Sequence, residues 1–314
     1  MSDLPGFVKI HEEGPREGFQ FESGPISTED KVRFVEALAE TGLRQIDCVS
    51  YVNVARVPGM RDAEEVARSI RRKAGVRYTG LWLNTRGLER ALQLPLDLVG
   101  AIRITASETF SVKNTGMTIE QTIADQRRWL AIYRENRIPV EWGYVMTAFG
   151  CNFEGEVPIS QVIQMVEHLL SLAKDAEVSL KGIYLADTVG HGTPASMEMR
   201  IGAVRERWPD LKVGLHLHDT RGTGVANAYA ALRLGVDQFD SSCAGLGGCP
   251  FAGHKGAAGN VCTEDLVYMC HEMGISTGIN LARLVECAEM AEKIVGHALP
   301  GKVMRAGPRA VAKH

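Results

Sequence analysis

Two stretches of the chain contain the residue types and spacings that chemistry needs. The segment 213–220, VGLHLHDT, is apolar at its start and places His216 and His218 two residues apart. Side chains of a β-strand alternate between its two faces, so both imidazoles project from one side. Histidine nitrogens are common ligands of divalent cations, and two of them at the end of a strand form half of a metal site.

The second stretch is a glycine-rich segment that contains one cysteine. Residues 245–250 read GLGGCP, and the segment continues to Gly259 and Asn260. Glycines allow such a loop to move and to bring a thiol over a substrate, whereas most cysteines are simply buried. We therefore assign a catalytic role to Cys249 and treat the other six cysteines as packing residues.

Short apolar runs alternate with amphipathic patterns along the chain. The apolar runs predict eight strands, at 7–11, 44–49, 78–83, 98–105, 140–145, 182–186, 212–217 and 238–242. Apolar residues at three- and four-residue spacing predict helices at 28–41, 61–73, 86–93, 118–135, 159–175, 193–207 and 222–235, with two more at 263–274 and 280–295.

This alternation predicts an α/β fold with a parallel sheet, because parallel neighbours need crossover connections. Eight strand–helix units indicate a (β/α)₈ TIM barrel with extra C-terminal helices. The alternative is an open doubly wound sheet, which would have a glycine fingerprint after the first strand that EGPREG at 13–18 does not match. We expect residues 1–295 to form one catalytic barrel, and residues 296–314 to form a basic tail containing glycine and proline.

Composition excludes several classes of protein. The 314 residues are 45% hydrophobic and 23% charged with a net charge of −3, which is typical of a globular protein without a nucleic-acid or membrane-binding field. Seven cysteines without a CxxC pair indicate a reducing compartment. No apolar run reaches the roughly 18–20 residues of a membrane span. We expect a cytoplasmic protein with no targeting segment.

Polar residues collect after the predicted strands, where barrels of this type place their active sites. Glu17 follows the first strand, and Asn260 follows the eighth. With His216 and His218 they make a mixed nitrogen and oxygen ligand set, which suits Mg²⁺ or Mn²⁺.

Three further charged residues lie at the same end of the predicted strands. Arg16, beside Glu17, is suited to hold an oxyanion. Asp47 lies in the second strand, and Asp187 ends the sixth. Asp187 is either the buried partner of an arginine or a residue with a direct role in the reaction.

Four motifs together resemble the 3-hydroxy-3-methylglutaryl-CoA lyase family of TIM-barrel metallolyases. They are GPREG at 14–18, HLHDTRG at 216–222, GLGGCP at 245–250 and GNVCTED at 259–265. The resemblance extends from about residue 7 to residue 295. It implies a carbon–carbon lyase that cleaves 3-hydroxy-3-methylglutaryl-CoA, or a related 3-hydroxy-3-carboxyalkyl acyl-CoA, to acetyl-CoA and a keto acid by retro-Claisen cleavage. The expected partner is an acyl-CoA thioester, and we expect a homodimer.

The resemblance also implies roles for individual residues. His216, His218 and Asn260 match metal ligands, Arg16 matches the enolate-stabilising arginine, and Cys249 matches the loop acid that protonates the enolate. Asp47 and Asp187 match acidic positions around the site. From the chemistry of the residues, His216 is suited to accept the proton of the 3-hydroxyl group.

The chain departs from the family pattern beside the substrate. Glu17 replaces the metal-binding aspartate of the family, and Asp47 replaces a longer glutamate. The loop 250–259 is about two residues longer and adds His254 and Lys255. These departures leave the acyl group of the substrate open.

Two other functions remain as alternatives. One is an aldolase or Claisen condensing enzyme of the same superfamily that acts on a 2-keto acid. The other is a barrel that has lost its chemistry and serves as a binding subunit, for which Glu17 is the one favourable feature.

Overall fold

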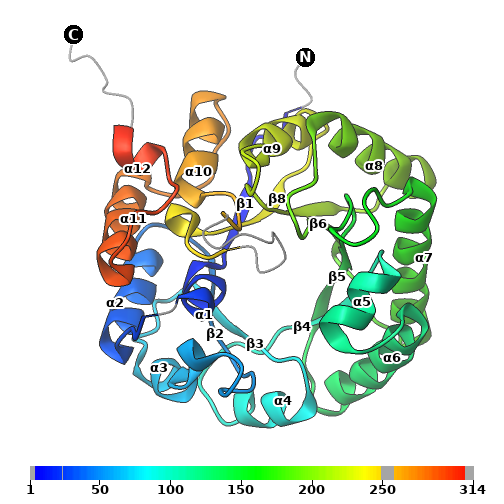
Figure 1. Cartoon of the computed structure of the whole chain (residues 1–314), viewed down its shortest axis with the longest axis horizontal. Helices are drawn as coiled ribbons and strands as arrows, with labels where there is room; N and C mark the ends of the chain where they lie inside the picture. The colour runs from blue at the N-terminus through cyan, green and yellow to red at the C-terminus, as the bar shows by residue number, and fades with distance from the viewer. Residues whose placement is uncertain (1–3, 23, 249–257, 308–314) are drawn as a thin grey trace. The chain divides into compact units, whose positions relative to one another are not determined.

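The computed structural model describes residues 4–22, 24–248 and 258–307 of the chain (Figure 1). All eight predicted strands are present. They are β1 Lys9–Glu12, β2 Gln45–Ser50, β3 Arg77–Leu81, β4 Gly100–Thr105, β5 Val140–Met146, β6 Gly182–Asp187, β7 Val213–Leu217 and β8 Gln238–Ser241. Their order in the sheet is β3-β2-β1-β8-β7-β6-β5-β4. Strands that are consecutive in the chain are therefore neighbours in the sheet, apart from β3 and β4, and the first strand lies beside the last.

Helices alternate with these strands. The main ones are α2 Thr28–Ala39, α3 Ala63–Ser69, α4 Thr85–Ala91, α5 Glu108–Thr115, α6 Ile119–Glu135, α7 Ile159–Asp175, α8 Pro194–Arg207 and α9 Gly224–Arg233. Three helices follow β8, namely α10 Thr263–Glu272, α11 Leu281–Val295 and α12 Val303–Ala306. The predicted (β/α)₈ barrel with extra C-terminal helices is confirmed as the fold class.

The chain divides into two units, which are described separately. The β4–β7 unit contains Leu98–Phe239, and the β1–β3 unit contains Gly6–Asp97 together with the described residues from Asp240 onward. Within the first, β4, β5, β6 and β7 pair in parallel, one after another. Within the second, β2 pairs in parallel with both β1 and β3.

Capping side chains begin several helices where the sequence predicted a start. The Ser27 hydroxyl accepts a hydrogen bond from the Asp30 amide at the start of α2. Thr118 and Gln121 form a reciprocal capping box before α6, and Thr193 begins α8 with a proline in its first turn. These starts are confirmed, because each depends on contacts between residues that are close in sequence.

The helical segments that were not predicted include α5 and η1. The helix α5 lies between β4 and α6 and starts at Ser107, whose hydroxyl accepts from the Phe110 amide. Its sequence has no clear apolar stripe, and Val112 is exposed. The short η1 segment, Gly14–Gly18, is a helical turn where the sequence indicated only a loop. Gly18 is needed there, because a Cβ would lie 2.3 Å from Cγ of Leu246.

The described part of the predicted tail is folded against α10. The amides of Lys302 and Val303 donate to the Asp265 carboxylate, the latter at 2.8 Å, and Met304 is buried. The last residues, 308–314, lie outside the described part, and the predicted domain boundary at residue 295 stays a prediction.

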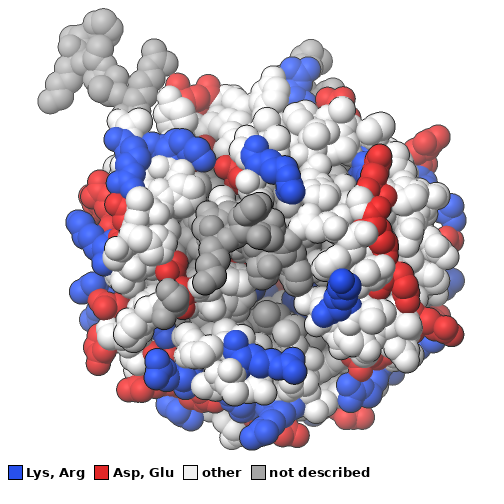
Figure 2. All heavy atoms as spheres, in the orientation of Figure 1, with Lys and Arg blue, Asp and Glu red and all other residues white. Residues whose placement is uncertain are grey.

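Two further features concern the length of the helices and the distribution of charge on the surface. No helix of the described residues has the length and apolar character to cross a membrane. On the face drawn in Figure 2, basic and acidic side chains are interspersed among uncharged ones.

A buried carboxylate joins three segments of the β1–β3 unit. Glu12, fully buried at the end of β1, accepts hydrogen bonds from the amides of Gly14 and Cys243, each at 2.8 Å, and from the Thr263 hydroxyl at 2.6 Å. Burial raises the pKa of Glu12 from 4.5 to about 7, and these hydrogen bonds oppose the shift only in part. The carboxylate therefore fixes where η1, with Arg16 and Glu17, leaves the sheet.

This raised pKa predicts a loss of stability as the pH rises. The folded chain holds the Glu12 proton between about pH 4.5 and 7, while the unfolded chain has released it, so the contribution is complete below that window and is lost through it. In Glu12→Gln, which resembles the protonated acid, we expect the fall in unfolding free energy between about pH 5.5 and about pH 8.5 to shrink by roughly 2 kcal/mol. Urea unfolding at both pH values measures this. The exposed control Glu206→Gln should behave like wild type, and an unchanged pH dependence in Glu12→Gln would contradict the assignment.

Candidate metal and catalytic site

Strand β7 brings two imidazole nitrogens to one point in the β4–β7 unit. The Nε2 atoms of His216 and His218 lie 3.3 Å apart, as the predicted two-residue spacing requires. His218 is 3% exposed, whereas His216 is half-buried and reaches solvent. Two ring nitrogens that converge in this way are arranged as a pair of ligands for one cation.

Asp187, at the end of β6, organises the loop that leads to α8. Its Oδ1 accepts from the His191 amide at 2.8 Å, and its Oδ2 accepts from the Gly192 amide at 3.0 Å. Burial raises the pKa of Asp187, while the Gly192 amide and the nearby His218 oppose that shift. The contacts give Asp187 a positioning role beside the histidine pair. Its predicted part in the reaction stays a prediction.

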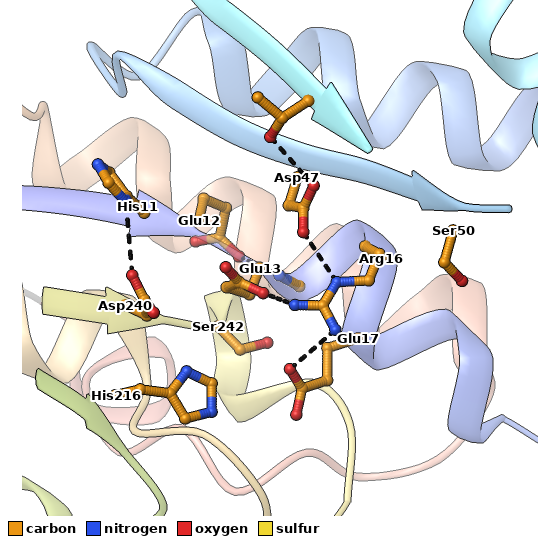
Figure 3. Close-up of polar contacts among 12 residues, drawn as sticks. His11, Glu12, Glu13, Arg16, Glu17, Asp47, Ser50, His216, Asp240 and Ser242 are labelled. Carbon is orange, nitrogen blue, oxygen red and sulfur yellow. Dashed lines mark hydrogen bonds and ion pairs between the residues drawn. The ribbon is translucent and has the colours of Figure 1, made fainter. Parts of the chain in front are cut away.

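Arg16 is the centre of a charge cluster in the β1–β3 unit (Figure 3). Its Nε donates to Asp47 Oδ2 at 2.9 Å, a terminal nitrogen lies 3.2 Å from Glu17 Oε2, and the other pairs with Glu13. Burial alone would lower the pKa of Arg16, but Asp47 and Glu17 outweigh it and hold that pKa above its usual value. Arg16 is therefore a fixed cation with its guanidinium held on three sides.

Both oxygens of Asp47 are engaged. Oδ2 accepts from Arg16, and Oδ1 accepts from the Thr79 hydroxyl of the neighbouring strand β3 at 3.0 Å. These bonds make Asp47 a support for the orientation of Arg16. The three carboxylates of Asp47, Glu13 and Glu17 surround a single guanidinium, which leaves an excess of negative charge that favours a bound cation.

Sequence reasoning missed Glu13 as a member of this cluster. The signal was present, because Glu13 lies three residues before Arg16, the spacing at which side chains of a helical turn meet. It was overlooked because the segment was expected to be a loop.

Asn260 provides a test of the predicted metal site. Its side chain is 1% exposed, and neither amide atom has a hydrogen-bond partner among the described residues. The backbone on either side is fixed: Gly259 lies against Gly248, and the Ser242 amide donates to the Val261 carbonyl at 3.0 Å. A buried amide without a partner is costly, and ligation of a cation by its oxygen would remove that cost. The residue fits the role predicted for it.

The remaining predicted residue, Cys249, lies outside the described residues, as do His254 and Lys255. Within the β1–β3 unit, Arg16, Glu17 and Asp47 are in contact, as expected of one site. Within the β4–β7 unit, His216 and His218 are in contact, and Asp187 interacts electrostatically with His218.

The chain is similar to known proteins over nearly its whole length. A family model described as HMGL-like matches residues 7–291. The hydroxymethylglutaryl-CoA lyase YngG of Bacillus subtilis is 38% identical over 298 residues, which are 95% of this chain and 96% of that protein. The cytoplasmic 3-hydroxy-3-methylglutaryl-CoA lyase of Rattus norvegicus is 39% identical over 310 residues, covering 99% of this chain and 88% of the relative.

A solved structure agrees with these relatives. An HMG-CoA lyase from Acinetobacter baumannii, in complex with coenzyme A and 3-methylmalate, superposes with a TM-score of 0.86 at 35% identity, covering 100% of this chain and 98% of the other. The resemblance inferred from the four motifs is confirmed, and so is the class of carbon–carbon lyase. The chain belongs to the HMGL-like family.

Proposed function

We propose that this protein cleaves 3-hydroxy-3-methylglutaryl-CoA, or a closely related 3-hydroxyacyl-CoA, to acetyl-CoA and a keto acid. The observation that carries the proposal is the convergence of the His216 and His218 nitrogens in a chain of this family. Relatives named for this activity match nearly the whole chain, which favours the lyase over the aldolase and condensing alternatives.

Glu17, His216, His218 and Asn260 are the residues proposed to hold the divalent cation, Mg²⁺ or Mn²⁺. The first three each offer one donor atom, and the Asn260 amide is buried without a partner among the described residues. Two imidazole nitrogens with two oxygens form a donor set that suits these ions. When bound, the cation would polarise the 3-hydroxyl oxygen of the substrate as a Lewis acid.

Three side chains of the protein accept a proton, stabilise the developing negative charge and donate a proton. Because one imidazole nitrogen cannot hold the cation and a proton together, His216 acts in this step as the base and not as a ligand. Its imidazole accepts the proton of the 3-hydroxyl group, C3 becomes a carbonyl carbon, and the C2–C3 bond breaks with its electron pair passing to C2. The guanidinium of Arg16, oriented by Asp47, stabilises the resulting thioester enolate. The Cys249 thiol donates a proton to C2, which completes acetyl-CoA.

The assembly and location of the protein are also proposals. A cytoplasmic location is supported by the cytoplasmic description of the rat relative and by the scattered free cysteines. An acyl-CoA partner is supported by the coenzyme A bound in the related structure. The homodimer stays a prediction.

The first test joins metal binding to turnover. Wild-type protein with Mg²⁺ or Mn²⁺ should release acetyl-CoA from 3-hydroxy-3-methylglutaryl-CoA or a close analogue. His218→Ala and Asn260→Ala should weaken Mn²⁺ binding at least tenfold in calorimetry, because each removes a donor or its support. His168→Ala, on helix α7 away from β7, is the matched control and should bind Mn²⁺ like wild type. Turnover of a free 2-keto acid, with none of any hydroxyacyl-CoA, would refute the lyase.

Cys249→Ala separates acid catalysis from metal binding. We expect Mn²⁺ affinity to be unchanged and kcat to fall about 1,000-fold, because a general acid contributes on this scale. The control is Cys270→Ala, at a buried packing position in α10. A Cys249→Ala variant with the wild-type rate would remove the thiol from the mechanism.

Arg16→Lys tests the charge cluster. The lysine keeps the positive charge but lacks the planar fork that contacts Asp47, Glu13 and Glu17 together. We expect kcat to fall about 100-fold, as on loss of an oxyanion-stabilising donor, with little change in Mn²⁺ affinity. The exposed Arg33→Lys on α2 serves as the control, and equal kcat values for Arg16→Lys and wild type would rule out the role.

A further inference from the structure

Arg103 is a half-buried cation of the β4–β7 unit that the proposed chemistry does not use. It lies on β4 between Ile102 and Ile104, which are completely buried on the other face of the strand. Its guanidinium carbon lies 5.2 Å from the centre of the Tyr144 ring. Across the described residues, the guanidinium forms neither an ion pair nor a hydrogen bond, whereas Arg16 has three carboxylates around it.

Arg103 belongs to a row of side chains that crosses four strands. Arg103 is in register with Tyr144, Tyr144 with Tyr184, and Tyr184 with Gly214. The two tyrosine rings are stacked with centres 4.6 Å apart. A Cβ on Gly214 would lie 2.8 Å from Cζ of Tyr184, so glycine is what allows that ring to extend over β7.

This row faces away from the helices. A Cβ on Gly143, one residue before Tyr144, would meet Ile183 at 2.8 Å and Leu169 of α7 at 3.3 Å. Residues 143 and 183 therefore point toward α7. Because strand side chains alternate, Tyr144 and Tyr184 point to the opposite face of the sheet.

The β7 end of this row lies below the histidine pair. His216 is two residues after Gly214 on β7, so it projects from the same face, roughly 6.6 Å nearer the carboxyl end of the strand. Ala186, in register with His216, has only a methyl side chain. A ligand held at His216 and His218 would therefore lie above the Gly214 end of the row, on the face from which Arg103 projects.

An unpaired guanidinium on this face of the sheet favours binding of an anionic ligand. Cation–π contact with Tyr144 offsets only part of the cost of removing the charge from water. A carboxylate is the group that a guanidinium binds best, through two parallel hydrogen bonds. The single carboxylate of 3-hydroxy-3-methylglutaryl-CoA is on the carboxymethyl arm of C3, so a methyl group on the arm that faces Arg103 would leave the guanidinium without a partner.

We propose that Arg103 is a specificity-determining residue that binds a carboxylate on C3 of the acyl group, where 3-hydroxy-3-methylglutaryl-CoA has a methyl group. This inference rests on the proposed lyase function and specifies its substrate class. The preferred substrate is then of the type 3-carboxy-3-hydroxyglutaryl-CoA.

The bond changes are those of the parent reaction. The C2–C3 bond breaks with its electron pair going to C2, the 3-hydroxyl loses its proton as C3 becomes a carbonyl carbon, and C2 gains a proton. The products are acetyl-CoA and 2-oxobutanedioate in place of acetoacetate. Arg103 contacts no reacting atom in this scheme.

The test compares kcat/KM for the carboxylate and methyl thioesters. Wild type should prefer the carboxylate substrate by about 100-fold or more, since a polar site left unpaired rejects an analogue strongly. Arg103→Met should lose this preference while its kcat/KM for the methyl thioester changes by only a few fold. Arg103→Lys should restore part of it. Arg127→Met, at an exposed position on helix α6, is the matched control and should behave like wild type.

Binding of the keto-acid products gives a second readout that needs no turnover. Calorimetry with Mn²⁺ should show 2-oxobutanedioate binding more tightly than acetoacetate to wild type, with the difference lost in Arg103→Met. Thermal unfolding confirms that each variant is folded, and the wild-type preference decides the matter if neither variant folds.

The possible outcomes distinguish failure of the Arg103 inference from failure of the proposed lyase function. If wild type cleaves the methyl thioester at least as well as the carboxylate thioester, the inference is overturned and the lyase function stands. If neither thioester is cleaved, the proposed function fails, and the product-binding difference between wild type and Arg103→Met still supports or overturns the anion site.

Discussion

The pleat of strand β7 is the constraint on which the site depends. Two residues of extended backbone separate His216 from His218, and this spacing brings their Nε2 atoms to 3.3 Å. A one-residue slip of the strand would turn both rings to the face that contacts the helices. The neighbouring strands prevent such a slip, because β7 is paired along its length with β6, and Gly214 accepts the ring of Tyr184.

The two units each contain a buried or half-buried arginine, and these two arginines differ in how their positive charge is paired. In the β1–β3 unit, Arg16 is surrounded by carboxylates and its orientation is over-determined. In the β4–β7 unit, the Arg103 guanidinium contacts the Tyr144 ring and forms no ion pair with a described residue. A guanidinium fully paired within the protein acts as a rigid fixture, whereas one without a carboxylate retains most of its capacity to bind a ligand. The same residue type thus serves orientation at one place and selection at the other.

Local patterns allowed most of the fold to be predicted. Apolar runs and capping residues located all eight strands and the long helices, because these signals depend on neighbours within a few residues. The histidine pair was predictable for the same reason. The helix α5 was not, because it has little apolar periodicity, and the η1 turn is held by Glu12 contacts with residues more than 200 positions away. The loop contacts of Asp187 likewise require the folded chain, since its sequence context permits several roles.

The long-range contacts of Glu12 have a consequence for the order in which the chain folds. The β4–β7 unit is built almost entirely from one continuous stretch, whereas the β1–β3 unit joins the first ninety or so residues to the last seventy or so. The hydrogen bonds of Glu12 cannot form until Cys243 and Thr263 have been synthesised, which are 231 and 251 residues further along the chain. On the ribosome the first segment is therefore made early but completes its fold last, after the middle of the chain has had time to fold. During that interval β1 exposes a carboxylate and an apolar strand without their partners, and the nascent chain is then most open to chaperones and to aggregation.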